Sequence, residues 1–234
     1  MRRSKRKVSK PDFVLPESTG RRFFFLLKEN YFELLKLSLL FTLFCLPLVT
    51  IPAAVTALSY VVSKLVNDRL YFVWHDFFKS FKANFVRSTI YGLLWLAAAF
   101  ILVQLWGFSN QQLSNDLINY FIKFFVIVLL ILLLNHAAYF HPIQAWIDLP
   151  FASVLKNALI IQFVGAKSTL KMFIVLLLSI GLTFFLQPIS LLVIPFLFSL
   201  IAFILCTFAM EPIQKYLVLK NLPPEDLVQS EVEN

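Results

Sequence analysis

The stretch that decides the fold is Leu37–Ser63, with the sequence LSLLFTLFCLPLVTIPAAVTALSYVVS. Its 27 residues carry no formal charge, and Pro47 and Pro52 interrupt it. A bilayer core needs about 20 apolar residues per helix, so the stretch could cross a membrane once. It could also fold into a short hairpin at the prolines, because proline ends a helix. The positions of the charged residues favour one of these two arrangements.

A single crossing from the cytoplasm would leave the loop Lys64–Arg87, with five basic residues, on the outer side. A hairpin returns this loop to the cytoplasm, and 20 of the 21 Lys and Arg residues then lie on the inner side. Only Lys123 lies near the outer face. The positive-inside rule therefore favours the hairpin, although its second arm, Ala53–Val66, is short for a bilayer.

The sequence thus predicts an all-α bundle of six transmembrane helices in a cell membrane, with both termini in the cytoplasm. Met172–Met210 contains 39 uncharged residues, which are enough for two helices that reverse at Gln187-Pro188. The expected spans, within a transmembrane domain of residues 29–220, are 31–49, 53–66, 89–107, 121–142, 170–187 and 190–210.

The composition of the whole chain agrees with this class. Of its 234 residues, 59% are hydrophobic and 15% are charged, and the mean hydropathy is +0.80. Soluble domains contain about 45–50% apolar and about 25% charged residues, and disordered chains contain fewer apolar residues still. These values exclude both classes and leave the net charge of +8 to be explained by its location.

Much of that charge lies in the cytoplasmic tail of residues 1–28, whereas the tail of residues 221–234 is acidic. Two interpretations of the basic tail remain open: a topogenic signal, or contact with anionic lipid at the inner face. Nucleic-acid binding is not expected, because no aromatic or glycine pattern accompanies the charges. The candidate lipid-contact residues are Arg2, Arg3, Lys5, Arg6, Lys7 and Lys10.

Two segments have the spacing of amphipathic helices at the cytoplasmic interface. In Leu70–Arg87, apolar side chains recur every three or four residues, and Asp76 could cap the helix or contact a partner. A weaker candidate follows Asp148, which could cap it. The first segment supplies the candidate partner interface: Asp76, Phe77, Phe78, Lys79, Phe81, Lys82 and Asn84.

A shift of 80 residues aligns these two segments and suggests an internal repeat. Asp68 then meets Asp148, and Arg87-Ser88-Thr89-Ile90 meets Lys167-Ser168-Thr169-Leu170. Both four-residue runs would open an outward-going helix, as in a parallel repeat. The identities are few, and whether the repeat is real stays open.

The chemistry-bearing residues within the predicted spans are few. Gln104, Asn135 and His136 form a candidate intramembrane polar site, which would either bind a ligand or hold helices together by hydrogen bonds. His136 and His141 lie about 140° apart around a helix and cannot share one metal ion. The chain has neither a glycine-rich phosphate loop nor a metal-binding pair of cysteines. No catalytic, metal or cofactor site is expected.

Two runs carry a resemblance to a known family. LPLVTIPAAVTALSY at residues 46–60 and DFFKSFKANF at residues 76–85 resemble the first hairpin and the interfacial segment of YesL-like bacterial integral membrane proteins. Ile51-Pro52 departs from the Gly-Pro pair expected there. The resemblance implies a domain of unknown function, often encoded beside carbohydrate-uptake and sugar-utilisation genes of Gram-positive bacteria, with sugar-uptake membrane proteins as possible partners.

Three functional hypotheses follow from these observations. The first is a non-enzymatic accessory or regulatory component associated with carbohydrate uptake or utilisation. The alternative is a small-molecule transporter or channel, and the third is an intramembrane enzyme, for which no nucleophile–base pair or metal site is apparent. At the cytoplasmic surface, Glu33 and Lys36 are expected to form an ion pair, because they lie three residues apart.

Overall fold

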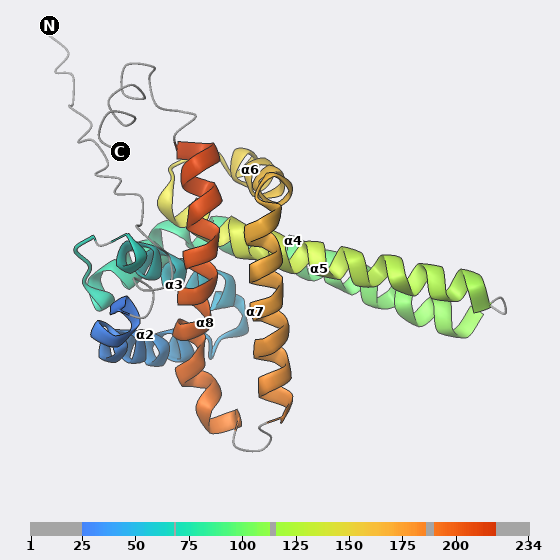
Figure 1. The fold of residues 1–234 in the computed structure, drawn as a ribbon, viewed down its shortest axis with the longest axis horizontal. Helices are drawn as coiled ribbons and strands as arrows, with labels where there is room; N and C mark the ends of the chain where they lie inside the picture. Colours follow the sequence, from blue (N-terminus) through green and yellow to red (C-terminus); the bar gives the residue numbers. More distant parts are fainter. Residues whose placement is uncertain (1–24, 68, 113–115, 186–189, 219–234) are drawn as a thin grey trace, which may run out of the picture.

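The computed structural model describes residues 25–67, 69–112, 116–185 and 190–218, which form helices joined by short connections (Figure 1). No strand occurs among these residues, so the expected all-α class is confirmed. The helices, with one 3₁₀ turn and one final π-helical turn, are α2 (Tyr31–Phe44), η1 (Leu48–Thr50), α3 (Ile51–Val66), α4 (Val73–Gln112), α5 (Asp116–Trp146), α6 (Phe151–Val164), α7 (Ala166–Phe185), α8 (Ser190–Ile213) and η2 (Gln214–Val218).

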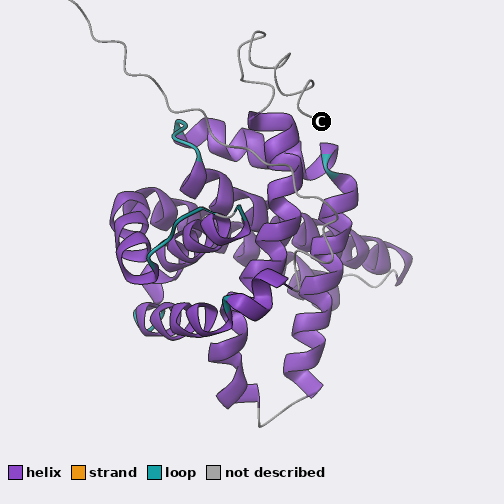
Figure 2. Cartoon of the chain, turned by 60° about the vertical axis from the view of Figure 1, so that its left-hand side comes forward, coloured by secondary structure: helices purple, strands orange, loops and turns teal. Residues whose placement is uncertain are grey.

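The helices form a body from which one long hairpin extends. In Figure 1, α4 and α5 lie side by side and run out across the picture, whereas α7 and α8 run from top to bottom. The second view, turned by 60°, shows the helices of the body from another side, with short loops between them (Figure 2). The two hairpins thus point in different directions from a shared base formed with α2, α3 and α6.

The expected break at the two prolines is confirmed. Helix α2 ends at Phe44, and α3 begins at Ile51 with Pro52 near its start. Thr50 stabilises the connection, because its hydroxyl lies within hydrogen-bond distance of the carbonyl oxygens of Phe44 and Pro47, either of which can accept its proton. Proline at the first helical positions is favourable, since the first amide groups of a helix have no intrahelical partner. The uncharged stretch is therefore two helices rather than one.

The expected separate helix over Leu70–Arg87 is wrong. Leu70 lies outside the helix, and Val73 begins a continuous helix of 40 residues that also contains the expected span from residue 89. No proline or glycine lies between Val73 and Tyr91 to end it. The Thr89 hydroxyl donates to the Phe85 carbonyl oxygen at 2.8 Å, a bond that helices accommodate.

The second expected interfacial helix does form, as α6, but Asp148 does not cap it. The residue before α6 is Pro150, without a side-chain cap, and the Asp148 side chain is exposed. After Gly165 the chain turns by 94° into α7. The two basic-Ser-Thr runs therefore differ locally: one lies inside α4, and the other begins α7, because Gly165 stands where the shifted sequence has Phe85.

The structure contains two buried apolar clusters, and α8 contributes to both. The first joins α2, α3 and the start of α4, and α8 adds Phe203 and Cys206. The second joins the middle of α4 to α5, α6 and α7, and α8 adds Met210 and Ile213. Cys45 and Cys206 are free cysteines. Helix α8 thus packs in both apolar clusters and joins them.

Within the described ranges, four helical segments are long and apolar enough to cross a membrane, and the bent α6–α7 pair would make a fifth. Helix α2, with 14 residues, is about 21 Å long and shorter than a bilayer core of about 30 Å. Only 6% of the apolar windows of α4 and α5 is buried in the protein. Such apolar surface on the arm is typical of helices that face lipid. The expected reversal at Gln187-Pro188 lies outside the described residues.

Helices α3 and α4 approach each other closely at one glycine. A Cβ atom placed on Gly92 would lie 2.2 Å from Pro52 Cγ, far inside van der Waals contact. The proline ring is rigid and cannot turn away as a long side chain could. Glycine at residue 92 is therefore required by the packing of α4 against the start of α3.

We expect Gly92→Ala to lower the free energy of unfolding by about 1–2 kcal/mol, because the overlap with Pro52 exceeds the gain in helix propensity. Gly107→Ala is the matched control, since nothing lies within 4 Å of a Cβ at residue 107. It should leave stability unchanged or raise it slightly. Thermal unfolding in detergent measures both, and equal stability of the two variants would contradict the packing argument.

Candidate functional site

The main cluster of buried polar side chains lies where α3, α4 and α5 meet. The Thr56 Oγ1 atom lies 2.8 Å from Ser88 Oγ and 2.8 Å from His141 Nδ1. Gln144 extends the cluster, because its Nε2 atom donates to Ser88 Oγ at 3.1 Å. All four side chains are buried. They connect three helices through one chain of hydrogen bonds, and we call this the Thr56 cluster.

The number of available protons assigns the donors within the Thr56 cluster. Thr56 has one hydroxyl proton, and the Pro52 carbonyl oxygen at 3.0 Å can only accept it. Ser88 therefore donates its hydroxyl proton to Thr56, and His141 donates from Nδ1. The bond to Thr56 fixes the orientation of the imidazole ring. The arrangement ties three helices together through hydroxyl, imidazole and amide groups.

His136 belongs to a second contact on the neighbouring face of α5. The Tyr91 hydroxyl lies 3.0 Å from His136 Nδ1, and His136 Nε2 lies 3.3 Å from the Leu155 carbonyl oxygen. Since that carbonyl oxygen can only accept, Nε2 carries a proton, and in the neutral imidazole Nδ1 then accepts from the Tyr91 hydroxyl. His136 thus links α4, α5 and α6. The two histidines bind separate partners, and no group of three His, Cys, Asp or Glu side chains in the described ranges could hold a metal ion.

The structure does not assemble the polar site expected from Gln104, Asn135 and His136. Gln104 is exposed on the arm, about 20 Å along α4 from Tyr91, which contacts His136. Asn135 is buried, and its amide donates to the carbonyl oxygen of Ile131 on its own helix. Gln104 therefore does not belong to the site. The mean hydropathy of a span does not distinguish its lipid-facing side from its packed side.

Sequence reasoning missed Thr56, Ser88 and Gln144 as members of a polar cluster. Small hydroxyl residues are common inside membrane helices, so Thr56 and Ser88 gave no individual signal. Gln144 lies three residues after His141 on the same face of α5, and this spacing could have indicated a shared environment. The partners of that face come from residues far away in the chain, which spacing alone does not identify.

The expected partner interface is divided between buried and exposed side chains. Asp76 and Phe77 are buried, whereas Lys79 and Lys82 are exposed. The phenylalanine face packs on protein, since the ring of Phe44 on α2 contacts three of these rings at 5.0–5.5 Å. They belong to Phe77, Phe78 and Phe81. The half-buried Asn84 donates to the carbonyl oxygen of Ser80. The three phenylalanine rings thus lie in or against the core, whereas the lysines stay exposed.

Asp76 anchors the start of α4 rather than a partner. Its Oδ2 atom accepts the Phe72 backbone N–H at 2.9 Å, and its Oδ1 atom lies 2.9 Å from Lys64 Nζ on α3. The lysine also lies over the ring of Tyr60, 5.0 Å from the centroid. This ion pair is mostly buried, so water screens it little. It fixes the end of α3 to the beginning of α4.

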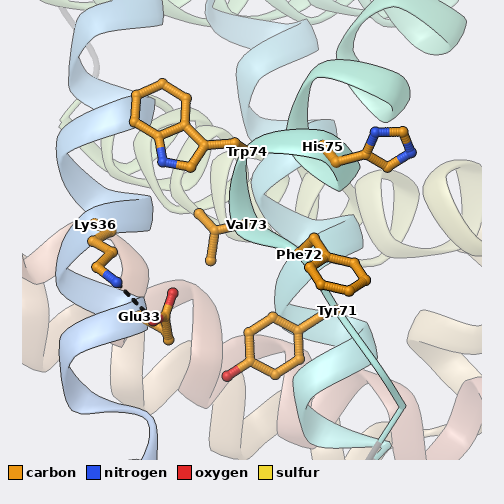
Figure 3. Close-up of a pocket in the computed structure, with 7 residues that line it drawn as sticks. All are labelled: Glu33, Lys36, Tyr71, Phe72, Val73, Trp74 and His75. Carbon is orange, nitrogen blue, oxygen red and sulfur yellow. Dashed lines mark hydrogen bonds and ion pairs between the residues drawn. The ribbon is translucent and has the colours of Figure 1, made fainter.

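An open groove of about 790 Å³ lies between α2 and the start of α4 (Figure 3). The expected ion pair of Glu33 and Lys36 is confirmed at 2.8 Å on one wall. Tyr71 donates its hydroxyl proton to Asn30, and burial together with the Glu33 carboxylate raises the pKa of Tyr71. Phe72, Val73, Trp74 and His75 complete the lining. None of the Thr56 cluster residues lines this groove.

The candidate lipid-contact residues Arg2, Arg3, Lys5, Arg6, Lys7 and Lys10 lie outside the described residues. Their contact with anionic lipid therefore stays a prediction. The acidic tail of residues 221–234 also lies outside the described range.

We expect Asp76→Ala to lower the free energy of unfolding by about 2–4 kcal/mol, because it leaves Lys64 with an unpaired, poorly hydrated charge. Glu33→Ala is the control, since it breaks an ion pair that is well exposed to solvent. Exposed pairs contribute at most about 1 kcal/mol. Thermal unfolding of both variants in detergent checks the difference, which would be absent if Asp76 were only a surface charge.

Thr56→Val preserves the shape of the side chain but removes the acceptor for Ser88 and His141. We expect a loss of about 1–3 kcal/mol in unfolding free energy, the cost of leaving buried donors unpaired. Thr207→Val is the matched control on α8, where the hydroxyl only donates to the Phe203 carbonyl oxygen of its own helix. If the two variants have the same melting temperature, the Thr56 cluster does not hold the helices together.

The comparisons with known proteins concern the first part of this fold. No curated protein and no solved structure matches the chain. Residues 32–104 match the family model described as "Protein of unknown function, DUF624". This range contains nearly all of α2, the whole of α3 and most of α4, and with them the contact between Pro52 and Gly92. Because DUF624 is the domain found in YesL-like proteins, the match confirms the resemblance of the chain to that uncharacterised family.

Proposed function

We propose that this protein is an accessory or regulatory component of carbohydrate uptake or utilisation in the cell membrane of a Gram-positive bacterium. The observation that supports a partner role over transport is the use of the buried hydroxyls and imidazoles. In the Thr56 cluster and around His136, these groups bond across helices rather than lining the groove between α2 and the start of α4. The association with carbohydrate rests on the family resemblance.

An enzymatic role is not part of this proposal. The closest approach of a hydroxyl to an imidazole is that of Thr56 and His141, a pair that superficially resembles a nucleophile with its base. Thr56 is 0% exposed and His141 is 7% exposed. The Thr56 proton is already bound by the Pro52 carbonyl oxygen, so this hydroxyl is neither accessible to a substrate nor activated by the histidine.

The proposed partner surface combines exposed apolar and basic side chains before and along the start of α4. Leu70 is 90% exposed, Phe72 is 71% exposed and Trp74 is 60% exposed. Lys79 and Lys82 are exposed further along the same helix. Aromatic and apolar side chains at a surface favour contact with protein or with the membrane interface. These five residues form the partner surface, in place of the buried Asp76 and Phe77.

The proposed orientation places this surface in the cytoplasm, with both termini on the same side. The six-span arrangement satisfies the positive-inside rule, because nearly every base then lies inside. The described helices supply four or five segments of sufficient length. In the six-span proposal α2 and α3 form the first, short hairpin. The basic N-terminal tail would contact anionic lipid at the inner face, and nucleic acid is not a proposed partner.

Affinity capture of the full chain from native membranes under gentle detergent tests the partner role. We expect a sugar-uptake membrane protein to co-purify, and recovery to fall about tenfold in a Trp74→Ala, Lys79→Ala double variant, as expected for loss of an interface anchor worth about 1.4 kcal/mol. Lys123→Ala on the distant arm is the matched control. Capture without any transport component, or sugar uptake by the protein alone in proteoliposomes, would contradict the proposal and favour the transporter alternative.

A further inference from the structure

In the arm, one side of α4 packs on α5 and the opposite side faces away from the protein (Figure 1). Trp95 marks the packed side, because its Nε1 atom donates to the Leu133 carbonyl oxygen of α5 at 3.3 Å. Trp106 lies on the same side, with Lys123 Nζ of α5 at 5.7 Å from its ring centroid. Gln104 follows Trp95 by nine residues, which is about 180° around the helix. The exposed Gln104 side chain therefore points away from α5.

The outward side of α4 around Gln104 is apolar. Leu93 is 60% exposed and Phe100 is 64% exposed, and Ala97 between them is also exposed. Among the described residues, no group forms a hydrogen bond with the Gln104 amide. This part of α4 is apolar enough to cross a membrane, so the amide of a single chain would face lipid tails. An amide without a hydrogen-bond partner is unfavourable in hydrocarbon.

The direction of the side chain turns the Gln104 amide away from the polar tip of the arm. Polar residues resume at Ser109, which lies about 7.5 Å further along the helix. Helical side chains tilt towards the N-terminus of their helix. From Gln104 that direction leads back along the apolar stretch of residues 92–103. The amide is thus directed into the apolar part of the arm and needs a partner there.

A second copy of the chain supplies a complementary partner. Copies that lie in one membrane with the same orientation have parallel arms, so Gln104 of each copy reaches the same depth. An amide donates through its nitrogen and accepts through its oxygen, so two facing glutamines satisfy each other. A single polar residue in the contact between parallel helices also fixes which residues meet.

The residues around Gln104 have the spacing of a parallel helix pair. Positions separated alternately by four and three residues lie on one side of α4, and we call them the pairing face: Leu93, Ala97, Phe100, Gln104 and Gly107. Packing within the chain does not require the glycine, since nothing lies within 4 Å of a Cβ at residue 107. Small residues such as Gly107 and Ala97 let membrane helices approach closely.

We propose that the α4–α5 arm pairs with the arm of a second copy through the pairing face, with reciprocal hydrogen bonds between the two Gln104 amides. The contact is parallel and twofold symmetric, so each pairing-face residue meets its own counterpart. This inference does not depend on the proposed partner role, which concerns a different surface at the start of α4.

Energy transfer between donor-labelled and acceptor-labelled full chains in lipid vesicles tests the pairing. Transfer measured at decreasing protein-to-lipid ratios gives the association constant. We expect Gln104→Leu to weaken association by about three- to tenfold, the effect of losing an interhelical hydrogen bond in a membrane. Asn110→Leu is the matched control, because Asn110 is an exposed amide of the same helix outside the pairing face.

Gly107→Leu tests the close approach of the two arms. We expect association to fall by about tenfold or more, because a leucine from each copy would separate the helices. The fold of the single chain should be retained, since the space around residue 107 is open. Gly181→Leu on α7 is the matched control, because nothing lies within 4 Å of a Cβ there either.

Disulfide cross-linking in vesicles locates the face. Phe100 and Ile101 are both 64% exposed and lie at nearly the same depth, but they point about 100° apart. We expect oxidation to convert Phe100→Cys to a covalent dimer and to leave Ile101→Cys largely monomeric, because a disulfide needs close Cβ atoms. Cys45 and Cys206 are present in both variants, so their contribution is equal.

Three results would overturn the proposal. Energy transfer no greater than that of randomly mixed chains would show that the copies do not associate. Equal dimer yields from Phe100→Cys and Ile101→Cys, or unchanged association in Gln104→Leu, would place the contact elsewhere. Cross-linking of Phe100→Cys in native membranes to a different protein, and not to a second copy, would assign the pairing face to that protein.

Discussion

The packing of α4 against the start of α3 is the constraint on which the rest of the structure depends. At this contact Pro52 fills the space that a side chain on residue 92 would occupy. One helical turn further along each helix, Thr56 meets Ser88 at 2.8 Å. The glycine permits the approach, and the hydroxyl pair fixes its register. His141 on α5 bonds to the same Thr56 hydroxyl. Helices α3, α4 and α5 therefore meet at one place.

Several features of the fold follow from this contact between α3, α4 and α5. Because α4 is fixed near its middle, its first half packs on α2 and α3, and its second half extends with α5 as the arm (Figure 1). The Lys64–Asp76 pair holds the first half in place. A second glycine–proline contact repeats the principle at the other end of the body, where a Cβ on Gly165 would lie 2.8 Å from Pro212 Cβ on α8. At both contacts, the absence of a glycine side chain leaves the space that a proline ring of another helix fills.

The sequence predicted those features that depend on residues close together in the chain. The prolines predicted the break between α2 and α3, and three-residue spacing predicted the pair of Glu33 and Lys36. The all-helical class followed from composition alone. The continuity of α4 was not predicted, because the change from an aromatic, basic stripe to an apolar span at residue 88 resembles a boundary. A helix ends where a residue such as proline or glycine interrupts it. A change in the polarity of its side chains does not interrupt the backbone.

The site itself could be predicted only in part, for a different reason. Asn135 and His136 were correctly identified as polar residues within a long apolar helix, but Gln104 was grouped with them on hydropathy alone. Hydropathy does not report the face of the helix, and Gln104 lies on the exposed side of the arm. Partners such as Ser88, which lies 56 residues before Gln144, become visible only once the helices are placed.

A few polar contacts are enough to fix how the helices of this bundle are oriented. Between membrane helices the hydrophobic effect supplies little preference for one arrangement, because lipid tails are as apolar as the packed side chains. An apolar surface rich in Leu, Ile and Phe would allow α5 to rotate or slide against its neighbours at small cost. His141 bonds Thr56 on α3, and His136 bonds Tyr91 on α4 and Leu155 on α6. A rotation of α5 would break both sets of bonds at once, so two histidines, five residues apart, select a single orientation of this helix.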